Sequence, residues 1–368
     1  MPLCLKCTGP PAAIPETGTL CLAPPLVHTL RTLRTLLKRI DLPFEEPAGH
    51  LLSVDLKHGK LGQLADELVR ALSQSELRDT KSLIVGEGAA FALSDIAAIQ
   101  PLSSLVTRVR SAWFFEMLGE GRLTSHFQPI VHAQDPGHVF AYECLLRGVE
   151  AGGKLVPPGR LFEAARDAEM LFPLDRAARL TAIRCASENG LDRGDSNLFI
   201  NFNPASIYDP RYCLAATVAA IRETGYRPDR VVFEVVESDE VKDVDHLVRI
   251  ANYYREAGFK VALDDLGSGY GSLNLLGILK PDFVKLDMHL IRGVDREAYK
   301  AGILSKLLEM SQSLGIESVA EGIETEGEYA WVREHGADYV QGFLFGKPMN
   351  PPPLPQRTDE LVAHATHR

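Results

Sequence analysis

The chain has 368 residues, of which 45% are hydrophobic and 24% are charged, and its formal net charge is -10. This acidic balance disfavours non-specific binding to duplex DNA or to an anionic membrane surface. The sequence contains no uninterrupted apolar run of the ~20 residues that a membrane-spanning helix needs. The N-terminus lacks the basic start and apolar core of a secretory signal, so we expect a cytoplasmic protein without a membrane span.

Residues 1–24 are rich in Pro and Thr and are expected to form an irregular N-terminal segment. Cys4, Cys7 and Cys21 have the spacing C-x2-C-x13-C, which fits part of a Zn²⁺ site with His28 as a fourth ligand. Spare thiols near a frayed terminus are the alternative, because the spacing is incomplete for a four-cysteine site. The remaining cysteines are expected to be packing residues in a reducing compartment: Cys144, Cys185 and Cys213.

Residues 25–118 are predicted to form a small α/β domain. Leu or Ile recurs at helical spacing over residues 26–40, which predicts a basic amphipathic helix. Its basic face either contacts an anionic partner or is simply solvated, and the second interpretation is favoured. Further strands are expected at 51–56 and 82–88, with helices around 61–73, 92–98 and 102–118. No motif here indicates a ligand, and we expect this domain to be regulatory or sensory.

From residue 122 onward, apolar strands alternate with helical patterns. Candidate strands lie at 125–131, 138–148, 197–204, 230–238, 260–265, 282–288, 317–323 and 339–346. Eight apolar strands with intervening helices predict a closed (β/α)8 TIM-like barrel over residues 122–355, followed by a tail at 356–368. The first two strands are joined only by HAQDPG, which is too short for a helical crossover. One strand of this pair is therefore expected to be irregular and antiparallel.

Polar residues recur in or at the ends of these strands: Glu143, Asn201, Glu234, Asp264, Lys285, Glu321 and Gln341. The carboxyl ends of barrel strands share one rim, where the chemistry of such folds takes place. Taken singly, an Asp before Gly can be a turn residue, a Glu can lie on an edge strand, and a Lys can extend to water. Their recurrence on strand after strand instead favours a Mg²⁺ or Mn²⁺ site, since the ligands are mostly oxygens. Such a metal would also screen the adjacent Asp264 and Asp265.

The order and spacing of these segments are similar to those of a known family. FQPIV, YECLLRG, INFNP, VFEVVES, ALDDLGSGYGSL, PDFVKLD, VAEGIET and VQGFLFGKPM follow one another along the chain. Residues ~122–355 thereby resemble an EAL domain, the bacterial cyclic di-GMP phosphodiesterase family. The signature itself reads Glu143-Cys144-Leu145, with Cys where Ala is usual. Because the functional member is the Glu, this change is expected to cost little.

The resemblance implies metal-dependent hydrolysis of cyclic di-GMP to linear pGpG, with two Mg²⁺ or Mn²⁺ ions and inhibition by Ca²⁺. The expected ligands are Glu143, Asn201, Glu234 and Asp264 for one ion, and Asp264, Asp265 and Glu321 for the other. The expected catalytic residues are Glu143, Asp265, Lys285, which orients the water or stabilises its charge, and Glu321, which assists proton removal. The expected substrate-binding residues are Gln128, Arg147, Asp287 and Gln341.

The resemblance also implies a homodimer through the barrel, with the loop after the paired aspartates at the interface. The residues expected to regulate this loop and the dimer are Glu237, Gly267, Gly269 and Glu324. The chain departs from the family pattern at Leu266, where Phe is usual, at Gly271, where Ser is usual, and at Val236, where Thr is usual. These departures bear on how the loop is tuned and leave the metal ligands in place.

Two other functions fit parts of the sequence. One is a catalytically weak receptor that binds cyclic di-GMP, and the other is a protein-interaction module served by the N-terminal domain. Loss of activity usually shows as a missing metal carboxylate, and every expected carboxylate is present in this sequence. An active phosphodiesterase is therefore the favoured interpretation.

Overall fold

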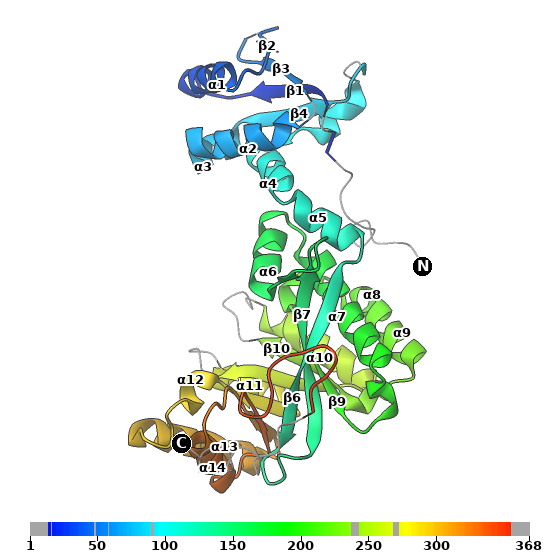
Figure 1. Ribbon diagram of the computed structural model, residues 1–368, viewed down its shortest axis with the longest axis vertical. Helices are drawn as coiled ribbons and strands as arrows, with labels where there is room; N and C mark the ends of the chain where they lie inside the picture. Colours follow the sequence, from blue (N-terminus) through cyan, green and yellow to red (C-terminus); the bar gives the residue numbers. More distant parts are fainter. Residues whose placement is uncertain are drawn as a thin grey trace. The chain divides into compact units, whose positions relative to one another are not determined.

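The computed structural model describes residues 14–15, 17–47, 49–57, 59–89, 92–236, 243–267 and 272–354 (Figure 1). Contacts divide the chain into two compact units. Among the described residues, the N-terminal unit contains 14–121 and 159–170, and the barrel unit contains 122–158 and 171–354. The N-terminal unit therefore includes a segment that the sequence places within the barrel.

The N-terminal unit is a five-stranded antiparallel sheet with the strand order β2-β3-β1-β4-β5. The β-α-β-β-α-β succession of its elements is the ferredoxin-like arrangement. Its elements are β1 (Gly18–Ala23), α1 (Val27–Arg39), β2 (Phe44–Glu45), β3 (Leu52–Leu56), α2 (Lys60–Ala71), α3 (Gln74–Asp79), β4 (Lys81–Val85), a 3₁₀ helix (Leu93–Ala98), β5 (Gln100–Pro101), α4 (Leu102–Arg110) and α5 (Ala112–Gly119).

One core holds this unit together. Leu20 and Leu22 of β1 alternate with residues on the opposite face of the sheet and pack with the apolar stripes of α1, α2 and α4. Residues 18–23, which we expected to be irregular, form the central strand, because Leu20 and Leu22 have the alternation that a half-buried strand requires. The helix expected over 102–118 is instead two helices, α4 and α5, which meet at Ser111.

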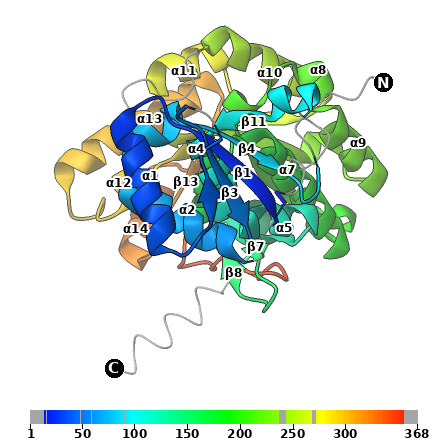
Figure 2. The same ribbon diagram turned by 90° about the horizontal axis from the view of Figure 1, so that it is seen from above.

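The barrel unit alternates strands and helices, as expected. Figure 2 shows α9, α10, α11 and α14 around the outside of the strands. The elements are β6 (Leu123–His132), β7 (Val139–Val149), β8 (Leu155–Val156), α7 (Leu171–Glu188), β9 (Asn197–Phe202), α8 (Pro210–Cys213), α9 (Ala215–Thr224), β10 (Val231–Val236), α10 (Val244–Glu256), β11 (Lys260–Leu266), α11 (Ser272–Leu279), β12 (Phe283–Leu286), α12 (Met288–Ile291), α13 (Ala298–Leu314), β13 (Glu317–Ala320), α14 (Glu326–Glu334) and β14 (Tyr339–Gln341). Between β8 and α7 the chain forms α6 (Pro158–Asp167), which belongs to the N-terminal unit from residue 159 onward.

Eight of these strands close into a barrel. Their order is β6-β14-β13-β12-β11-β10-β9-β7, and the pairing of β6 with β7 closes the ring. β6 is antiparallel to both of its neighbours, whereas the pairs from β7 through β9 to β14 are parallel. The predicted TIM-like barrel with one antiparallel strand is confirmed. β6 is the irregular strand because it is joined to β7 by a short hairpin rather than by a helix.

A layer of apolar side chains fills the barrel below the rim. Its members are Ile130, Ala141, Phe199, Val232, Ala262, Phe283, Val319 and Tyr339, with Phe140 packed against them. On each parallel strand this residue lies two positions before the polar residue predicted for the rim, and on the antiparallel β6 it lies two positions after Gln128. Because side chains on a strand point to the same face every second residue, the rim residues also face inward. The apolar layer closes the floor of the site.

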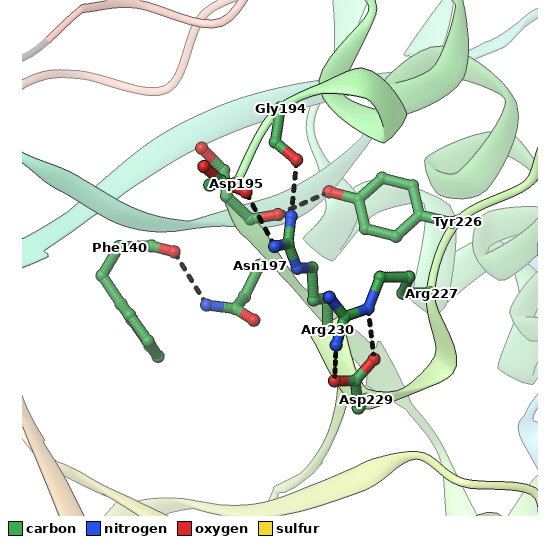
Figure 3. Close-up of polar contacts among 9 residues, drawn as sticks. Phe140, Gly194, Asp195, Asn197, Tyr226, Arg227, Asp229 and Arg230 are labelled. Carbon is green, nitrogen blue, oxygen red and sulfur yellow. Dashed lines mark hydrogen bonds and ion pairs between the residues drawn. The ribbon is translucent and has the colours of Figure 1, made fainter.

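The amino ends of β9 and β10 are held together by polar contacts (Figure 3). Arg230 donates hydrogen bonds to the Gly194 carbonyl and to Asp195, and the Tyr226 hydroxyl donates to the Ser196 carbonyl at 2.7 Å. Asn197 donates its side-chain amide to the Phe140 carbonyl on β7 at 2.9 Å. These contacts lie at the amino end of β9, whereas Asn201 lies near its carboxyl end. They therefore stabilise the barrel without touching the rim.

Among the described residues, no helix combines the length and the apolar character that crossing a membrane would require.

Candidate functional site

Every barrel strand contributes one polar side chain to the rim. The set is Gln128 on β6, Glu143 on β7, Asn201 on β9, Glu234 on β10, Asp264 on β11, Lys285 on β12, Glu321 immediately after β13 and Gln341 on β14. Glu234 is paired on both sides, with β9 and β11, so it does not lie on an edge strand. The structure therefore brings the polar residues expected at the strand ends onto one rim, together with Gln128.

The Lys285 ammonium lies at the centre of the acidic side chains. Its Nζ is 2.7 Å from Glu321, 2.9 Å from Glu234, 3.2 Å from Asp264 and 3.5 Å from Glu143. The side chain is only 1% exposed, so Lys285 does not extend to water. Lys285 is thus a cation built into the chain that separates the carboxylates.

One ammonium does not balance this much negative charge. Burial raises the pKa of Glu234, of Glu321 and of Asp264, although Lys285 opposes each shift. Burial also opposes the charge of Lys285, but the surrounding carboxylates outweigh it and raise its pKa well above the ordinary value. A divalent cation would therefore compete with protons for these acids.

Asp265 reaches the site through an unusual backbone conformation. Consecutive strand residues point to opposite faces, so Asp264 and Asp265 would normally diverge. The pairing of β11 with β12 shifts register between Leu263 and Leu266, and Asp265 has a positive φ of 57°. This irregularity turns the second carboxylate toward the first, which is a common use of such a bulge. Burial and then the neighbouring Asp264 raise the pKa of Asp265 to about 6.

Glu143 is held by amide groups from two other strands. Gln341 donates its Nε2 to one carboxylate oxygen at 2.6 Å, and Asn201 donates its Nδ2 to the other at 3.2 Å. Gln128 lies opposite Glu143 in the β6–β7 pairing and donates to the Gly346 carbonyl at 3.4 Å. Both oxygens of Glu143 are therefore oriented by neighbours before any ligand binds.

The residues at this rim fit divalent metal. Ligand oxygens of Asp264, Asp265 and Glu321 all lie within 4.8 Å of one another. Glu234 is fully buried, yet its Oε2 has no hydrogen-bond partner among the residues described, and the same holds for Oε1 of the buried Gln341. Mg²⁺ and Mn²⁺ prefer oxygen ligands, and this rim combines a cluster of carboxylates with a buried carboxylate oxygen that has no partner among the described residues.

A pocket of about 250 Å³ opens onto the cluster. Its lining includes these predicted residues: Gln128, Glu143, Asp265, Asp287, Glu321, Glu324 and Gln341. Asp287 is buried and caps α12 by accepting a hydrogen bond from the His289 amide at 2.8 Å, so it has a structural role as well. Arg147 lies four residues beyond Glu143 on β7 and is half-buried, but it is not among the residues that line this pocket.

Some of the remaining predicted residues lie within the described part of the chain and others lie outside it. Gly267 has a φ of 105°, and a side chain there would overlap Leu290, so this position requires glycine. Leu266 is a buried core residue, and Glu324 pairs with Arg292 at the pocket. The remaining predictions lie outside the residues the structure describes: Glu237, Gly269, Gly271, Cys4 and Cys7. Val236 ends β10, and Cys21 lies on β1, where burial raises the pKa of its thiol.

Two groups of supporting residues escaped the sequence analysis. Glu328 accepts hydrogen bonds from the amides of Gly293, Glu324 and Thr325, and so orders the segment after Glu321. Asp175 and Arg179 form a fully buried ion pair on α7. The sequence does contain a sign of this pair: an Asp and an Arg lie one helical turn apart on an otherwise apolar helix face. Such charged groups are rarely buried without a specific partner.

The barrel and its acidic rim define a known class of protein. The model of the EAL domain family matches residues 111–348, and the chain belongs to this family.

Curated relatives are similar to the chain over the same region. The probable cyclic di-GMP phosphodiesterase PdeG of Escherichia coli K12 is 28% identical over 242 residues, which is 63% of this chain and 46% of PdeG. The probable cyclic di-GMP phosphodiesterase PdeB of the same organism is 31% identical over 229 residues, which is 60% of this chain and 42% of PdeB. The chain spans less than half the length of the curated relatives it matches.

Solved structures match as well. A standalone EAL protein from Vibrio cholerae O395, in its c-di-GMP-bound form, is 34% identical with a TM-score of 0.57, covering 64% of this chain and 95% of that one. BlrP1 of Klebsiella pneumoniae, a manganese/cy-diGMP complex, is 24% identical with a TM-score of 0.55, covering 90% of this chain and 96% of that one. At that identity BlrP1 supports the fold alone. Because the match covers 90% of this chain, the similarity in fold includes residues outside the barrel.

Proposed function

We propose that this protein hydrolyses cyclic di-GMP to linear pGpG with the help of two divalent ions. The observation that carries the proposal is the rim of oxygen ligands. Glu143, Glu234, Asp264 and Glu321 surround Lys285, Asn201 donates to Glu143, and Asp265 lies beside Asp264 and Glu321. Three of these carboxylates, Glu143, Asp265 and Glu321, line one pocket. The names of the similar proteins support the substrate class.

The proposed ligands are the carboxylates and the amide of this rim. One Mg²⁺ or Mn²⁺ would be held by Glu143, Asn201, Glu234 and Asp264. The other would be held by Asp264, Asp265 and Glu321. Ca²⁺ is expected to inhibit, because it favours a larger and looser coordination shell. When bound, such ions neutralise charge on the phosphodiester and lower the pKa of water. The Oε2 of Glu234 supports this assignment, since this buried carboxylate oxygen has no hydrogen-bond partner among the described residues.

The chain's own groups supply proton transfer and charge. Glu321 lies 2.7 Å from the Lys285 ammonium and borders the pocket, so it is placed to accept a proton from the attacking water. Lys285 keeps its proton because four carboxylates surround it, and it stabilises negative charge that develops during attack. Gln128, Asp287 and Gln341 line the pocket and are proposed to contact the dinucleotide, with Arg147 as a phosphate ligand beyond it.

Turnover of cyclic di-GMP by the purified protein, followed by chromatography for pGpG, tests this function. Glu143→Ala removes a rim carboxylate and is expected to lower kcat/KM by about 100-fold or more, because charge stabilisation by metal contributes several kcal/mol. The matched control Glu309→Ala removes a carboxylate from an exposed pair with Lys306 and should keep wild-type turnover. Binding of cyclic di-GMP without product in Mg²⁺ or Mn²⁺ would show a receptor. Absence of both binding and product would favour an interaction module.

We further propose that the N-terminal unit regulates the barrel. Residues 159–170 belong to that unit by their contacts and continue directly into α7 of the barrel. Within the unit, the Arg160 guanidinium lies 4.5 Å from the centre of the Trp113 ring. Trp113→Ala should therefore change turnover although Trp113 is not a rim residue. Unchanged turnover and stability would argue against regulation of the barrel through residues 159–170.

Three further points stay proposals. A homodimer through the barrel is supported by the exposed Leu273 and Ile278 on α11, which follows the loop after Asp265. Sedimentation of the wild type and of Leu273→Asp tests it.

Zn²⁺ at Cys4, Cys7 and Cys21 and the cytoplasmic location remain predictions of the sequence.

A further inference from the structure

A buried ion pair lies on α7, outside the acidic rim. Asp175 and Arg179 are one helical turn apart on the same face of α7, and Arg179 Nη1 donates to Asp175 Oδ2. Asp175 is 2% exposed and Arg179 is 0% exposed. Taking two charges out of water costs several kcal/mol for each ion, and such pairs often contribute little net stability compared with apolar residues. The pair therefore calls for an explanation other than stability.

The Asp175 carboxylate binds the turn that follows β9. Its Oδ1 accepts a hydrogen bond from the Asn203 amide at 2.8 Å, and its Oδ2 accepts one from the Ser206 hydroxyl at 2.8 Å. The Asn203 side chain in turn accepts from the Ala205 amide at 2.9 Å, which closes the turn locally. A carboxylate side chain is suited to this task because its two oxygens can accept several hydrogen bonds at once.

Arg179 connects the same carboxylate to a further helix. Its Nε donates to the hydroxyl of Thr217 on α9 at 3.2 Å, and Thr217 is fully buried. The guanidinium thus fixes the orientation of the Asp175 carboxylate between α7 and α9. Both oxygens of Asp175 remain directed at the turn after β9.

The turn begins two residues after Asn201, the residue that β9 contributes to the rim. Asn201 donates its Nδ2 to Glu143 at 3.2 Å, which leaves the amide oxygen available to a metal. A ligand amide must be held within a few tenths of an ångström to be useful, and groups behind the ligands commonly provide this restraint. A shift of the Asn203 amide would be transmitted to Asn201 through a single intervening residue.

We propose that Asp175 and Arg179 are positioning residues that hold the carboxyl end of β9, and with it the Asn201 amide, for metal binding. This inference rests on the proposed metal-dependent function. β9 is also anchored at its amino end, where the Tyr226 hydroxyl donates to the Ser196 carbonyl (Figure 3). That second anchor lies away from the rim and provides a matched control.

The test measures Mn²⁺ binding to the full chain without substrate, by the electron paramagnetic resonance signal of free Mn²⁺, beside the urea midpoint of each variant. The double variant Asp175→Leu/Arg179→Leu replaces the pair by apolar groups and is expected to stay folded. It should bind Mn²⁺ about 10- to 100-fold more weakly, the usual effect of losing a group behind a metal ligand. Tyr226→Phe should lower the urea midpoint and leave Mn²⁺ affinity unchanged.

Ser206→Ala provides a second variant in case the double variant does not fold. It removes the hydroxyl that donates to Asp175 and to the Asn203 carbonyl, and it adds no buried charge. It should weaken Mn²⁺ binding in the same direction and to a smaller extent. A folded double variant, or Ser206→Ala, with wild-type Mn²⁺ affinity would overturn the inference, as would an equal loss in Tyr226→Phe. Failure of the wild type to bind Mn²⁺ would instead overturn the proposed metal-dependent function, and this inference with it.

Discussion

The Lys285 ammonium lies 2.9 Å from Oε1 of Glu234, and both side chains are buried at the centre of the barrel rim. The other oxygen of Glu234 has no hydrogen-bond partner among the described residues. The chain thus places one permanent cation among several acids and leaves a coordination position for a second cation.

Lys285→Met should destabilise the protein when metal is removed with a chelator. Loss of the ammonium leaves the surrounding carboxylates buried and unpaired, which typically costs about 3–5 kcal/mol. Excess Mg²⁺ should recover part of this loss, because it binds the folded state. Urea unfolding with and without Mg²⁺ measures both effects. Lys306→Met, at an exposed pair with Glu309, is the control and should change stability by less than about 0.5 kcal/mol. Equal unfolding of the two variants would contradict a central role for Lys285.

Mn²⁺ affinity should rise with pH up to about 6. The pKa of Asp265 is raised to about 6, so in the metal-free protein this carboxyl holds a proton that metal must displace. Between about pH 4, the ordinary range for Asp, and pH 6, the folded state binds more protons than the unfolded chain. The free energy of unfolding of the metal-free protein should therefore fall as pH rises across this window. Mn²⁺ titrations from pH 5 to 7 measure the affinity, and Asp265→Asn should show a shallower dependence. Parallel curves for the two proteins would assign the proton to another group.

Asp265→Gly should be more stable than Asp265→Ala. Both changes remove the same carboxylate, so the comparison isolates the backbone, which has a φ of 57° at this position. Ala resists the left-handed conformation by about 1 kcal/mol relative to Gly, and the greater freedom of Gly in the unfolded chain offsets part of this. Urea midpoints of the two metal-free variants provide the measurement. A higher midpoint for Asp265→Ala would mean that the backbone relaxes when the carboxylate is lost.

Gly342→Ala should damage both stability and activity. A methyl group at Gly342 would overlap the backbone nitrogen and oxygen of Ile323, which cannot rotate away. Overpacking of this kind typically costs about 1–3 kcal/mol, and the strain falls beside Gln341, which orients Glu143. Gly302→Ala is the control, because it lies within α13 with open space around it and should raise stability by about 0.5–1 kcal/mol. Thermal unfolding and turnover distinguish the two variants, and a stable, active Gly342→Ala would contradict the close approach.

Much of the barrel could be predicted from local pattern. The eight strands lie where apolar runs predicted them, and the short HAQDPG hairpin indicated the antiparallel pair. The rim residues of the parallel strands were also visible, because each one interrupts an apolar run two positions after an inward-facing core residue. A period of two is a property of the strand itself, so a single chain is enough to reveal it.

Other features depend on contacts between residues far apart in the chain. The sequence showed a Lys within FVKLD, but its position among acids from four other parts of the barrel depends on closure of the ring. The assignment of residues 159–170 to the N-terminal unit follows from packing and not from their position in the sequence.

The same division applies at the level of single residues. The pattern of strands, helices and inward-facing acids is local, because it depends only on backbone periodicity and on the cost of burying polar groups. The hydrogen bond from the Asn203 amide to Asp175 joins residues 28 positions apart, and the turn of Asp265 toward Asp264 arises where β11 shifts register against β12. Such relationships depend on distance and direction in space, which only the packed chain defines.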